Sequence, residues 1–265
     1  KEVNKLEARL SVRLLNRTTR SLSLTPEGKQ FFEQCKQLVS DAEMAIDVIN
    51  HKNQTPHGLL KISCPVTFGT NTLQPILSKY MYLYPGVTLE MDFDDRHVDV
   101  VQEGFDVVIR ATQSLDDSSL ICKKIADYKS YAIASPGYLN KFGEPKEAKE
   151  LVNHQCICYS NHKNPEKWRF TRKNGKHEQV EVKPTILCNN AEMELAMVLD
   201  HHGVCRLPEF YLGDHLGKGS LKPLFEDYEF PTVSIYAIYP SKKHLSPKVR
   251  CLIDLLVESL NPKGY

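Results

Sequence analysis

The sequence predicts an α/β protein in which a short basic unit and one long helix precede two lobes built on parallel strands. Basic residues gather near the N-terminus, although the formal net charge of the whole chain is only +1. A regular apolar spacing follows over about 27 residues, as expected for a long helix. From residue 58 onward, short apolar runs alternate with helical stretches, an order typical of parallel sheets.

Length and composition limit the classes of protein to which the chain can belong. The chain has 265 residues, of which 41% are hydrophobic and 25% charged, so we expect about two globular domains. No apolar run reaches the roughly 18 residues of a membrane span, and no signal peptide opens the chain. The eight cysteines lack the spacing of a disulfide scaffold and are typical of a reducing cytoplasm. We therefore expect a cytoplasmic protein with no membrane partner.

Residues 1–24 change character midway. "KEVNKLEARL" has apolar residues at helical spacing, whereas "RLLNRTTRSLSLT" does not. Leu22 and Leu24 alternate with serines, as in a strand, and residues 16–19 are predicted to form a turn. A helix followed by a two-stranded ribbon is the second half of a winged helix-turn-helix. We expect the first half to precede Lys1.

The ribbon is basic: from Arg9 to Pro26 there are four arginines and no acidic residue. It is either a solvated hairpin or a wing whose Arg17 and Arg20 contact DNA phosphates or a minor groove. The helix that follows favours the wing. The predicted DNA-binding residues are Lys1, Lys5, Asn16, Arg17, Thr18, Thr19 and Arg20.

The long helix begins with Thr25 as N-cap and Pro26 at the first helical position. Its apolar and small residues then recur in steps of four and three, the heptad pattern of a coiled-coil seam. No second long helix is predicted nearby, so pairing with another copy is favoured over packing in a bundle. A dimer with basic wings suits a twofold DNA site. The predicted dimerisation residues are Phe31, Cys35, Leu38, Ala42, Ala45 and Ile49.

The polar segment "NHKNQTPHG" predicts a hinge, which closes the helical region at residues 25–57. Strands are then expected at "LLKISC", "VTLEMDF" and "FDVVIRA", with a helix at "FGTNTLQPILSKYMYLYPG" and a short one at "RHVDVVQEG". Similar alternation continues to the C-terminus and includes a strand at "VCRLP". We predict a two-lobed domain over 58–265, with lobe I at 58–134 and 235–265 and lobe II at 135–234.

Several motifs resemble one protein family. "KLEARLSVRLLNRTTRSLSLTPEG" resembles the end of the helix-turn-helix and the wing of LysR-type transcriptional regulators. "YPGVTLEMDFDDRHVDVVQEGFDVVIRATQSLDDSSLICKKI" resembles the first half of that family's effector-binding domain, and "ASPGYL", "HQCICY", "GVCRLPEF" and "YAIYPSKKHLSPKVRCLIDLL" follow in the family's order. The resemblance implies a DNA-binding head, a dimerising linker helix and a two-lobed, periplasmic-binding-protein-like (type 2) sensor for a small molecule. It also favours a tetramer.

The chain also departs from the family. Most base-reading residues would precede Lys1. His201, His202 and Gly203 replace a common Gly-Leu-Gly, and Cys205 and Arg206 stand where aliphatic residues are usual. These changes are expected on the cleft side of lobe II, so the resemblance does not identify the effector.

Ligands of open α/β sheets collect at the carboxyl ends of strands, which here points to "CPVTFGT". The helix start there favours an anion, although Thr67 also suits a simple helix cap. Arg110 closes a buried strand and needs either an acid of the protein or a ligand carboxylate. We expect a small anionic or strongly polar effector and no cofactor. The candidate effector-binding residues are Thr67, Phe68, Thr70, Arg110, Ala111, Thr112, Tyr159, Asn189, Asn190, Cys205 and Leu207.

Other clusters favour plainer interpretations. His154, Cys156 and Cys158 alternate along one strand, but a metal site would need His162 as fourth ligand, and the CxC spacing favours a packed strand. The acidic run over residues 90–106 is typical of a solvated face. A thiol at Cys205 leaves oxidation sensing open, with plain ligand binding favoured.

Three functions remain in competition. A binding protein of periplasmic type would need a signal peptide and would have no use for the basic ribbon or the heptad helix. An enzyme is disfavoured because no nucleophile elbow, phosphate loop or dinucleotide fingerprint is present. The sequence therefore predicts a regulator that binds double-stranded DNA and a small effector.

Overall fold

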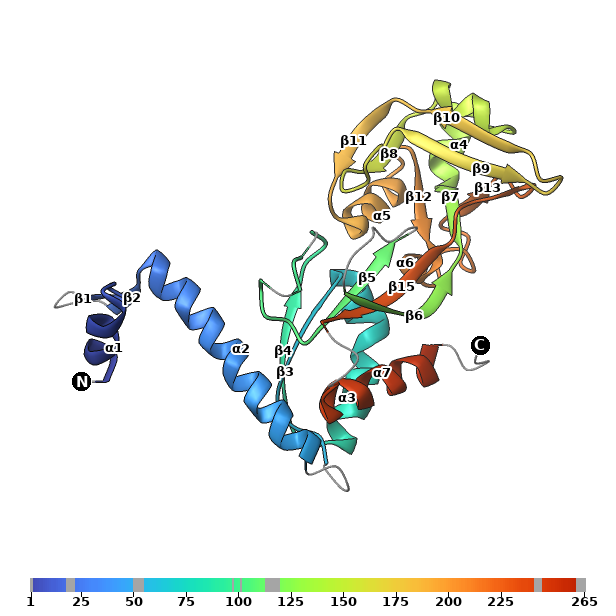
Figure 1. The fold of residues 1–265 in the computed structure, drawn as a ribbon. Helices are drawn as coiled ribbons and strands as arrows, with labels where there is room; N and C mark the ends of the chain where they lie inside the picture. The colour runs from blue at the N-terminus through green and yellow to red at the C-terminus, as the bar shows by residue number, and fades with distance from the viewer. Residues whose placement is uncertain are drawn as a thin grey trace.

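The computed structural model describes residues 2–17, 22–49, 55–96, 98–100, 102–112, 120–240 and 245–260. A small N-terminal head is followed by one long helix and then by a two-lobed body (Figure 1). Within the described residues, no helix is both long and apolar enough to cross a membrane.

The head contains α1 (Glu2–Leu10), β1 (Leu15–Arg17) and β2 (Leu22–Leu24). β1 and β2 form the predicted antiparallel ribbon, with Asn16 opposite Ser23. Residues 16 and 17 are therefore in a strand and not in the predicted turn, because their backbone pairs with β2. The tip of the ribbon, residues 18–21, lies outside the described residues. The Glu7 carboxylate fixes the ribbon to α1 by accepting hydrogen bonds from the backbone N–H groups of Leu14 and Leu15, at 2.8 and 3.0 Å.

Helix α2 (Pro26–Ile49) starts directly after the ribbon. Thr25 is the predicted N-cap: its hydroxyl accepts from the Gly28 N–H at 2.9 Å and donates to the Arg13 carbonyl at 2.6 Å. A Cβ atom on Gly28 would lie 1.9 Å from the Leu14 carbonyl oxygen. The first turn of α2 is thus packed against the ribbon so closely that only glycine fits.

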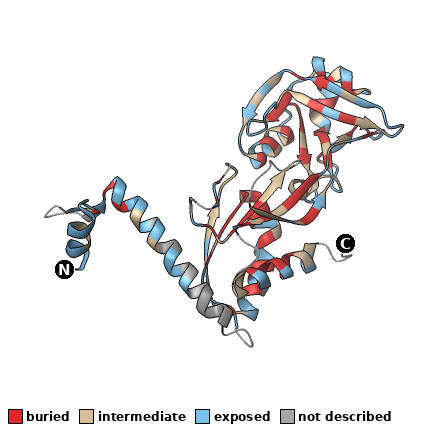
Figure 2. Ribbon diagram, in the orientation of Figure 1, coloured by how far each residue is buried: buried red, intermediate tan, exposed pale blue. Residues whose placement is uncertain are grey.

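Lobe I is built on a five-stranded sheet of order β4-β3-β5-β15-β6. Its strands are β3 (His57–Cys64), β4 (Gly86–Phe93), β5 (Val107–Thr112), β6 (Ile121–Tyr128) and β15 (Val233–Tyr239). β3 is parallel to β4 and β5, as predicted, whereas β15 is antiparallel to both β5 and β6. The π-helix η1 (Phe68–Leu73), α3 (Gln74–Leu83) and α7 (Pro247–Leu260) complete the lobe and bury its apolar core (Figure 2).

Lobe II contains a second five-stranded sheet, of order β11-β8-β12-β7-β13. Its strands are β7 (Ser130–Ala134), β8 (Cys156–Tyr159), β11 (Pro184–Cys188), β12 (Val204–Pro208) and β13 (Lys222–Leu224). The helices are α4 (Pro136–Phe142), the 3-10 helix η2 (Ala148–Asn153), α5 (Ala191–Leu199) and α6 (Glu209–Leu212). A small sheet of β9 (Lys167–Arg172), β10 (His177–Glu181) and β14 (Tyr228–Glu229) covers one face.

The structure shifts two expected boundaries. β7 pairs with β12 and β13, so residues 130–134 belong to lobe II, although the sequence analysis assigned them to lobe I. β15 begins at Val233 in the first sheet, two residues before the predicted return. The described part of 96–104 forms turns where a short helix was predicted. Side-chain contacts of Arg96, described below, hold this loop.

Candidate functional site

A pocket of about 410 Å³ lies between the lobes. This volume falls within the range of small-molecule sites, roughly 300–1,000 Å³. Lobe I contributes η1 and the residue before it, while lobe II contributes α5, α6 and the turn after α6. The lining residues are Thr67, Asn71, Glu192, Leu195, Ala196, Leu199, Tyr211, Gly213, Asp214, His215 and Lys218.

Of the three candidates at the helix start, only Thr67 lines this pocket. Its side chain does not cap the helix and is only 3% exposed. Phe68 is completely buried and packs edge-to-face against Phe210, so its predicted ligand role is replaced by a core role. Thr70 is exposed, and its hydroxyl donates to the carbonyls of Val66 and Thr67 at 3.3 and 3.2 Å.

The helix start already has an anion from the chain itself. The Val66 N–H donates to a carboxylate oxygen of Asp95 at 3.3 Å. Burial raises the pKa of Asp95, and the Val66 N–H and the nearby Arg110 lower it. One backbone donor of the helix start, the Val66 N–H, is therefore occupied by an aspartate that follows β4.

Arg110 lies within electrostatic range of Asp94 and Asp95. Its guanidinium donates to Ser63 Oγ at 3.2 Å and to the Ile109 carbonyl at 2.8 Å. Burial lowers the pKa of Arg110, while Asp94 and Asp95 raise it. Among the described residues, no carboxylate forms an ion pair with Arg110, so the structure does not decide between the two partners that the sequence allowed. Ala111 and Thr112 follow on β5 and are half-buried.

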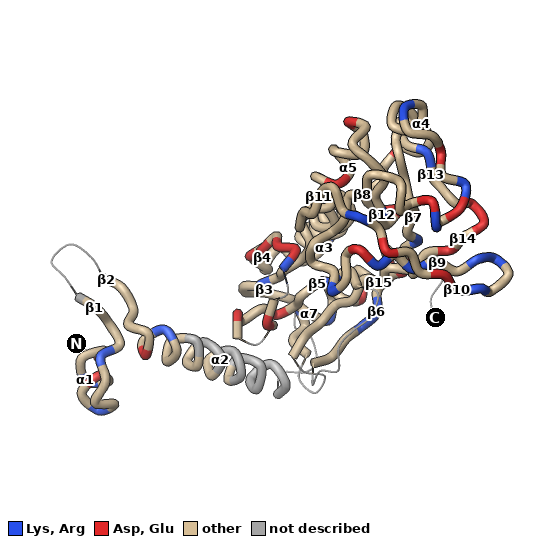
Figure 3. Tube along the Cα trace, turned by 90° about the horizontal axis from the view of Figure 1, so that it is seen from above, with Lys and Arg blue, Asp and Glu red and all other residues tan. Residues whose placement is uncertain are grey.

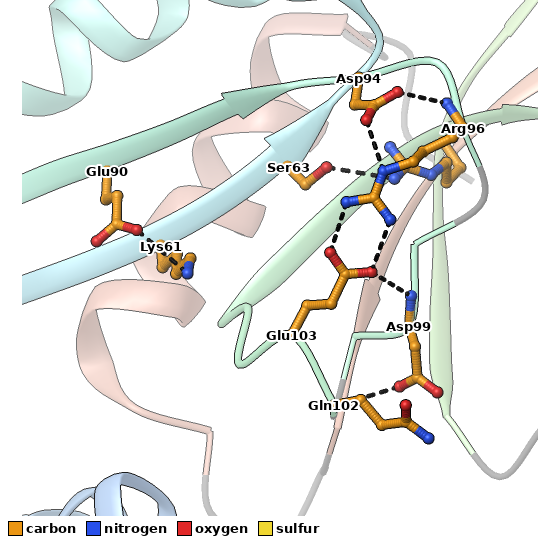
Figure 4. Close-up of polar contacts among 9 residues, drawn as sticks. Lys61, Ser63, Glu90, Asp94, Arg96, Asp99, Gln102 and Glu103 are labelled. Carbon is orange, nitrogen blue, oxygen red and sulfur yellow. Dashed lines mark hydrogen bonds and ion pairs between the residues drawn. The ribbon is translucent and has the colours of Figure 1, made fainter. Parts of the chain in front are cut away.

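The loop after β4 is held by Arg96 (Figure 4). Its guanidinium contacts Asp94 at 2.6 Å and both Glu103 oxygens at 3.0 and 2.7 Å. These hydrogen bonds lower the pKa of Glu103. The acids after β4, red in Figure 3, therefore shape a loop at the solvent-exposed surface that was predicted for them. Asn161 of lobe II donates to the Asp95 carbonyl at 3.1 Å, so this loop also contacts the second lobe.

The lobe II candidates Tyr159, Asn189 and Asn190 lie near the start of α5 or before it in the chain. Burial raises the pKa of Tyr159 to about 12, and its ring lies 5.3 Å from that of His162. Asn189 is exposed. The Asn190 side chain caps α5 by accepting from the Met193 N–H at 2.9 Å. None of these candidates lines the pocket.

Cys205 and Leu207 do not face the pocket. They are 0% and 2% exposed and pack in the core between the lobe II sheet and its helices. Strand alternation sends the intervening Arg206 to the other face, where its guanidinium lies 5.8 Å from the Trp168 ring centroid. Burial raises the pKa of Cys205 well above its ordinary value, which suppresses the reactive thiolate.

The other singled-out histidines and cysteines have structural surroundings. Cys156 and Cys158 are buried in the lobe II core, as expected for a packed strand. His154 Nδ1 lies 3.1 Å from the Tyr138 hydroxyl. His201 Nδ1 lies 2.7 Å from Ser135 Oγ, next to the start of α4, and His201 is not among the residues that line the pocket.

Sequence reasoning missed most of the pocket. Glu192, Leu195, Ala196 and Leu199 occupy one face of α5, and Tyr211 follows from α6. Their helical spacing was visible, but nothing in the sequence distinguished this face from an ordinary solvent-exposed one. Beneath it, the carboxyl of Glu194 is 1% exposed, and its Oε2 has no hydrogen-bond partner among the described residues.

The predicted DNA-binding residues are only partly described. Lys5 is exposed and pairs with Glu2 at 3.1 Å, and Asn16 is exposed on β1. Arg17 belongs to β1, but its side chain lies outside the described parts. Lys1, Thr18, Thr19 and Arg20 also lie outside the described residues.

The predicted seam of α2 is accessible where it is described. Leu38 is 66% exposed, and Ala42 is exposed as well. Phe31 and Cys35 are half-buried. The side chains of Ala45 and Ile49 lie outside the described parts of the helix.

Two family models cover nearly the whole chain. Residues 1–29 match the model for the bacterial regulatory helix-turn-helix protein of the lysR family. Residues 53–261 match the model for the LysR substrate binding domain. The chain belongs to the LysR-type transcriptional regulators. It is a DNA-binding regulator with an effector-binding domain, and the resemblance seen in its motifs is confirmed.

Individual relatives agree with this family. The chain is 30% identical to the transcriptional regulator CrgA of Neisseria meningitidis, over 97% of the chain and 86% of CrgA. The CrgA structure has a TM-score of 0.69 at 29% identity and covers 98% of the chain and 87% of CrgA. Full-length AphB, the Vibrio cholerae virulence activator, has a TM-score of 0.68 at 28% identity, over 96% of the chain and 87% of AphB.

Proposed function

We propose that this LysR-type regulator senses a small molecule in the pocket between its lobes and transmits that signal through α2 to DNA. The observation that carries this proposal is the two-sided lining. Thr67 and Asn71 come from lobe I, whereas Glu192 and Tyr211 come from lobe II. A ligand that contacts both sides stabilises one placement of the lobes over others, which is the requirement for a ligand-driven switch.

The proposed output is a dimer on DNA in the cytoplasm. The exposed Leu38 and Ala42 lie on the heptad seam, where a second α2 would cover them. Each dimer then presents two basic ribbons, with Arg17 and Arg20 toward phosphates. We propose that two such dimers form a tetramer, in keeping with the family.

Filling the pocket tests the sensing step. Ala196 lies on the exposed side of α5 within the lining, so Ala196→Trp occupies the pocket without entering the core. We expect this variant to bind promoter DNA but to lose its response to effector-containing cell extract in a transcription assay. Val152→Trp is the matched control, because Val152 is 48% exposed on η2 and outside the lining. A full response by Ala196→Trp would reject the pocket as the sensing site.

A conservative pair tests the contact itself. Thr67→Val removes a hydroxyl of the lining at nearly constant shape, and Thr88→Val is the matched control, at an exposed threonine of β4 outside the lining. We expect effector affinity, measured by calorimetry, to fall about two- to tenfold for Thr67→Val alone, since one neutral hydrogen bond contributes roughly 0.5–1.5 kcal/mol. Equal affinities for both variants would place the effector away from Thr67.

A further inference from the structure

We infer that the effector carries a positively charged amine, which Glu192 holds in the inter-lobe pocket. This inference rests on the proposed sensing function and adds the chemical class of the ligand. It replaces the anionic group that the helix start predicted.

Carboxylates dominate the charge of the pocket. Two of them, Glu192 and Asp214, and one ammonium group, that of Lys218, line it. Lys218 and Asp214 face each other at 3.6 Å, and both are strongly exposed, so these two charges offset one another. Glu192 has no ion-pair partner in the part of the chain that the structure describes. Its charge is left for a ligand.

The neighbouring acid makes an anion still less favourable. Burial raises the pKa of Asp95, and the charges of Asp94 and Glu192 raise it further, while the Val66 N–H and the Arg110 guanidinium lower it. Asp95 also accepts the Val66 N–H at 3.3 Å, so the helix start no longer offers that donor to a ligand. An anion in this pocket would meet like charges, whereas an ammonium group would reduce the repulsion between these carboxylates.

The remaining polar groups suit an amine. Thr67 lines the pocket and is 3% exposed, and within the described ranges its hydroxyl makes no hydrogen bond. The hydroxyl oxygen is not among the buried atoms without a partner, so it stays accessible from the pocket, where it can accept from an N–H donor. Tyr211 adds a neutral phenol, whose pKa is raised by burial, and a ring face that attracts cations.

The test uses near-isosteric probes of opposite charge with the whole chain. Benzylammonium is compared with benzoate, and butane-1,4-diammonium with succinate, by calorimetry and ligand-observed NMR. The variants are Glu192→Gln, which removes the charge at constant shape, and Glu229→Gln, a control at an exposed glutamate of β14 outside the lining. Ala196→Trp serves as the blocked pocket.

We expect saturable binding of the ammonium probes, weakened about two- to fivefold by Glu192→Gln, as for an exposed ion pair, and unchanged by Glu229→Gln. Ammonium binding that is insensitive to Glu192→Gln, or the absence of any ammonium binding, would overturn the inference. Carboxylate probes that bind and are excluded by Ala196→Trp would overturn it too, while leaving the sensing pocket in place. Probe binding of either charge that persists in Ala196→Trp would reject the pocket itself.

Discussion

Replacing Glu194 with glutamine should stabilise lobe II at alkaline pH and have little effect in acid. The carboxyl of Glu194 is 1% exposed beneath α5, and its Oε2 has no hydrogen-bond partner among the described residues. Burial raises its pKa from 4.5 to about 8, and the positive charge of Arg206 only partly opposes this shift. The folded protein therefore keeps Glu194 protonated at neutral pH.

The sign and size of the effect follow from proton linkage. Between pH 4.5 and about 8, folded Glu194 holds a proton that the unfolded chain has already released. The free energy of unfolding therefore falls as pH rises through this window. At about 1.4 kcal/mol per pH unit, the loss is on the order of 4–5 kcal/mol by pH 8. Glutamine cannot ionise, so this contribution disappears in the variant.

Trp168 provides a local assay. It is the only tryptophan of the chain and is 2% exposed in the core of lobe II. Urea unfolding can be monitored by the fluorescence of Trp168. We expect wild type and Glu194→Gln to have similar urea midpoints near pH 5, and the midpoint of the variant to exceed that of wild type by a growing margin up to pH 8. Glu192→Gln, two residues away but exposed, serves as the control. If the urea midpoints of wild type and Glu194→Gln changed with pH in the same way, the reasoning would be refuted.

Three further predictions concern the head and α2. Joint replacement of Arg17 and Arg20 by alanine should weaken binding to specific and random DNA alike. The slope of the logarithm of the binding constant against the logarithm of the salt concentration should become less steep by roughly one to two units, and an unchanged slope would mean that these arginines do not contact phosphates. Leu38→Asp should abolish the α2 dimer in sedimentation while circular dichroism stays native, and a retained dimer would contradict the seam. Gly28→Ala should force the ribbon from α2, because its Cβ would lie 1.9 Å from the Leu14 carbonyl oxygen, and DNA affinity should fall without loss of lobe stability; normal affinity would show that the junction adjusts.

Local signals predicted the elements well. Thr25 forms the expected cap because an N-cap needs only a side chain and a backbone N–H three residues later. β12 (Val204–Pro208) matches the predicted strand "VCRLP" because a short apolar run between two turns has few alternatives. The same strand contains two site predictions that were wrong: alternation along β12 places both Cys205 and Leu207 in the core, although both were predicted to line the cleft.

The pocket depended on contacts that sequence patterns do not encode. Asp95 reaches the helix start 29 positions earlier in the chain, and no local rule links a residue after β4 with Val66. Glu192 and Tyr211 meet η1 only because the two lobes face each other. A short helix was predicted at "RHVDVVQEG", whereas the described residues of this segment form turns, and Arg96 pairs with Asp94 and Glu103.

The position of β15 has a consequence for synthesis on the ribosome. This strand, residues 233–239, lies between β5 and β6 in the first sheet, although more than 100 residues separate it from both. All strands of the lobe II sheet are translated before it. Lobe II can therefore fold while β5 and β6 still expose unpaired edges, and lobe I closes last. A ribosome that stalls before residue 233 would release a protein with two open strand edges, which are templates for aggregation.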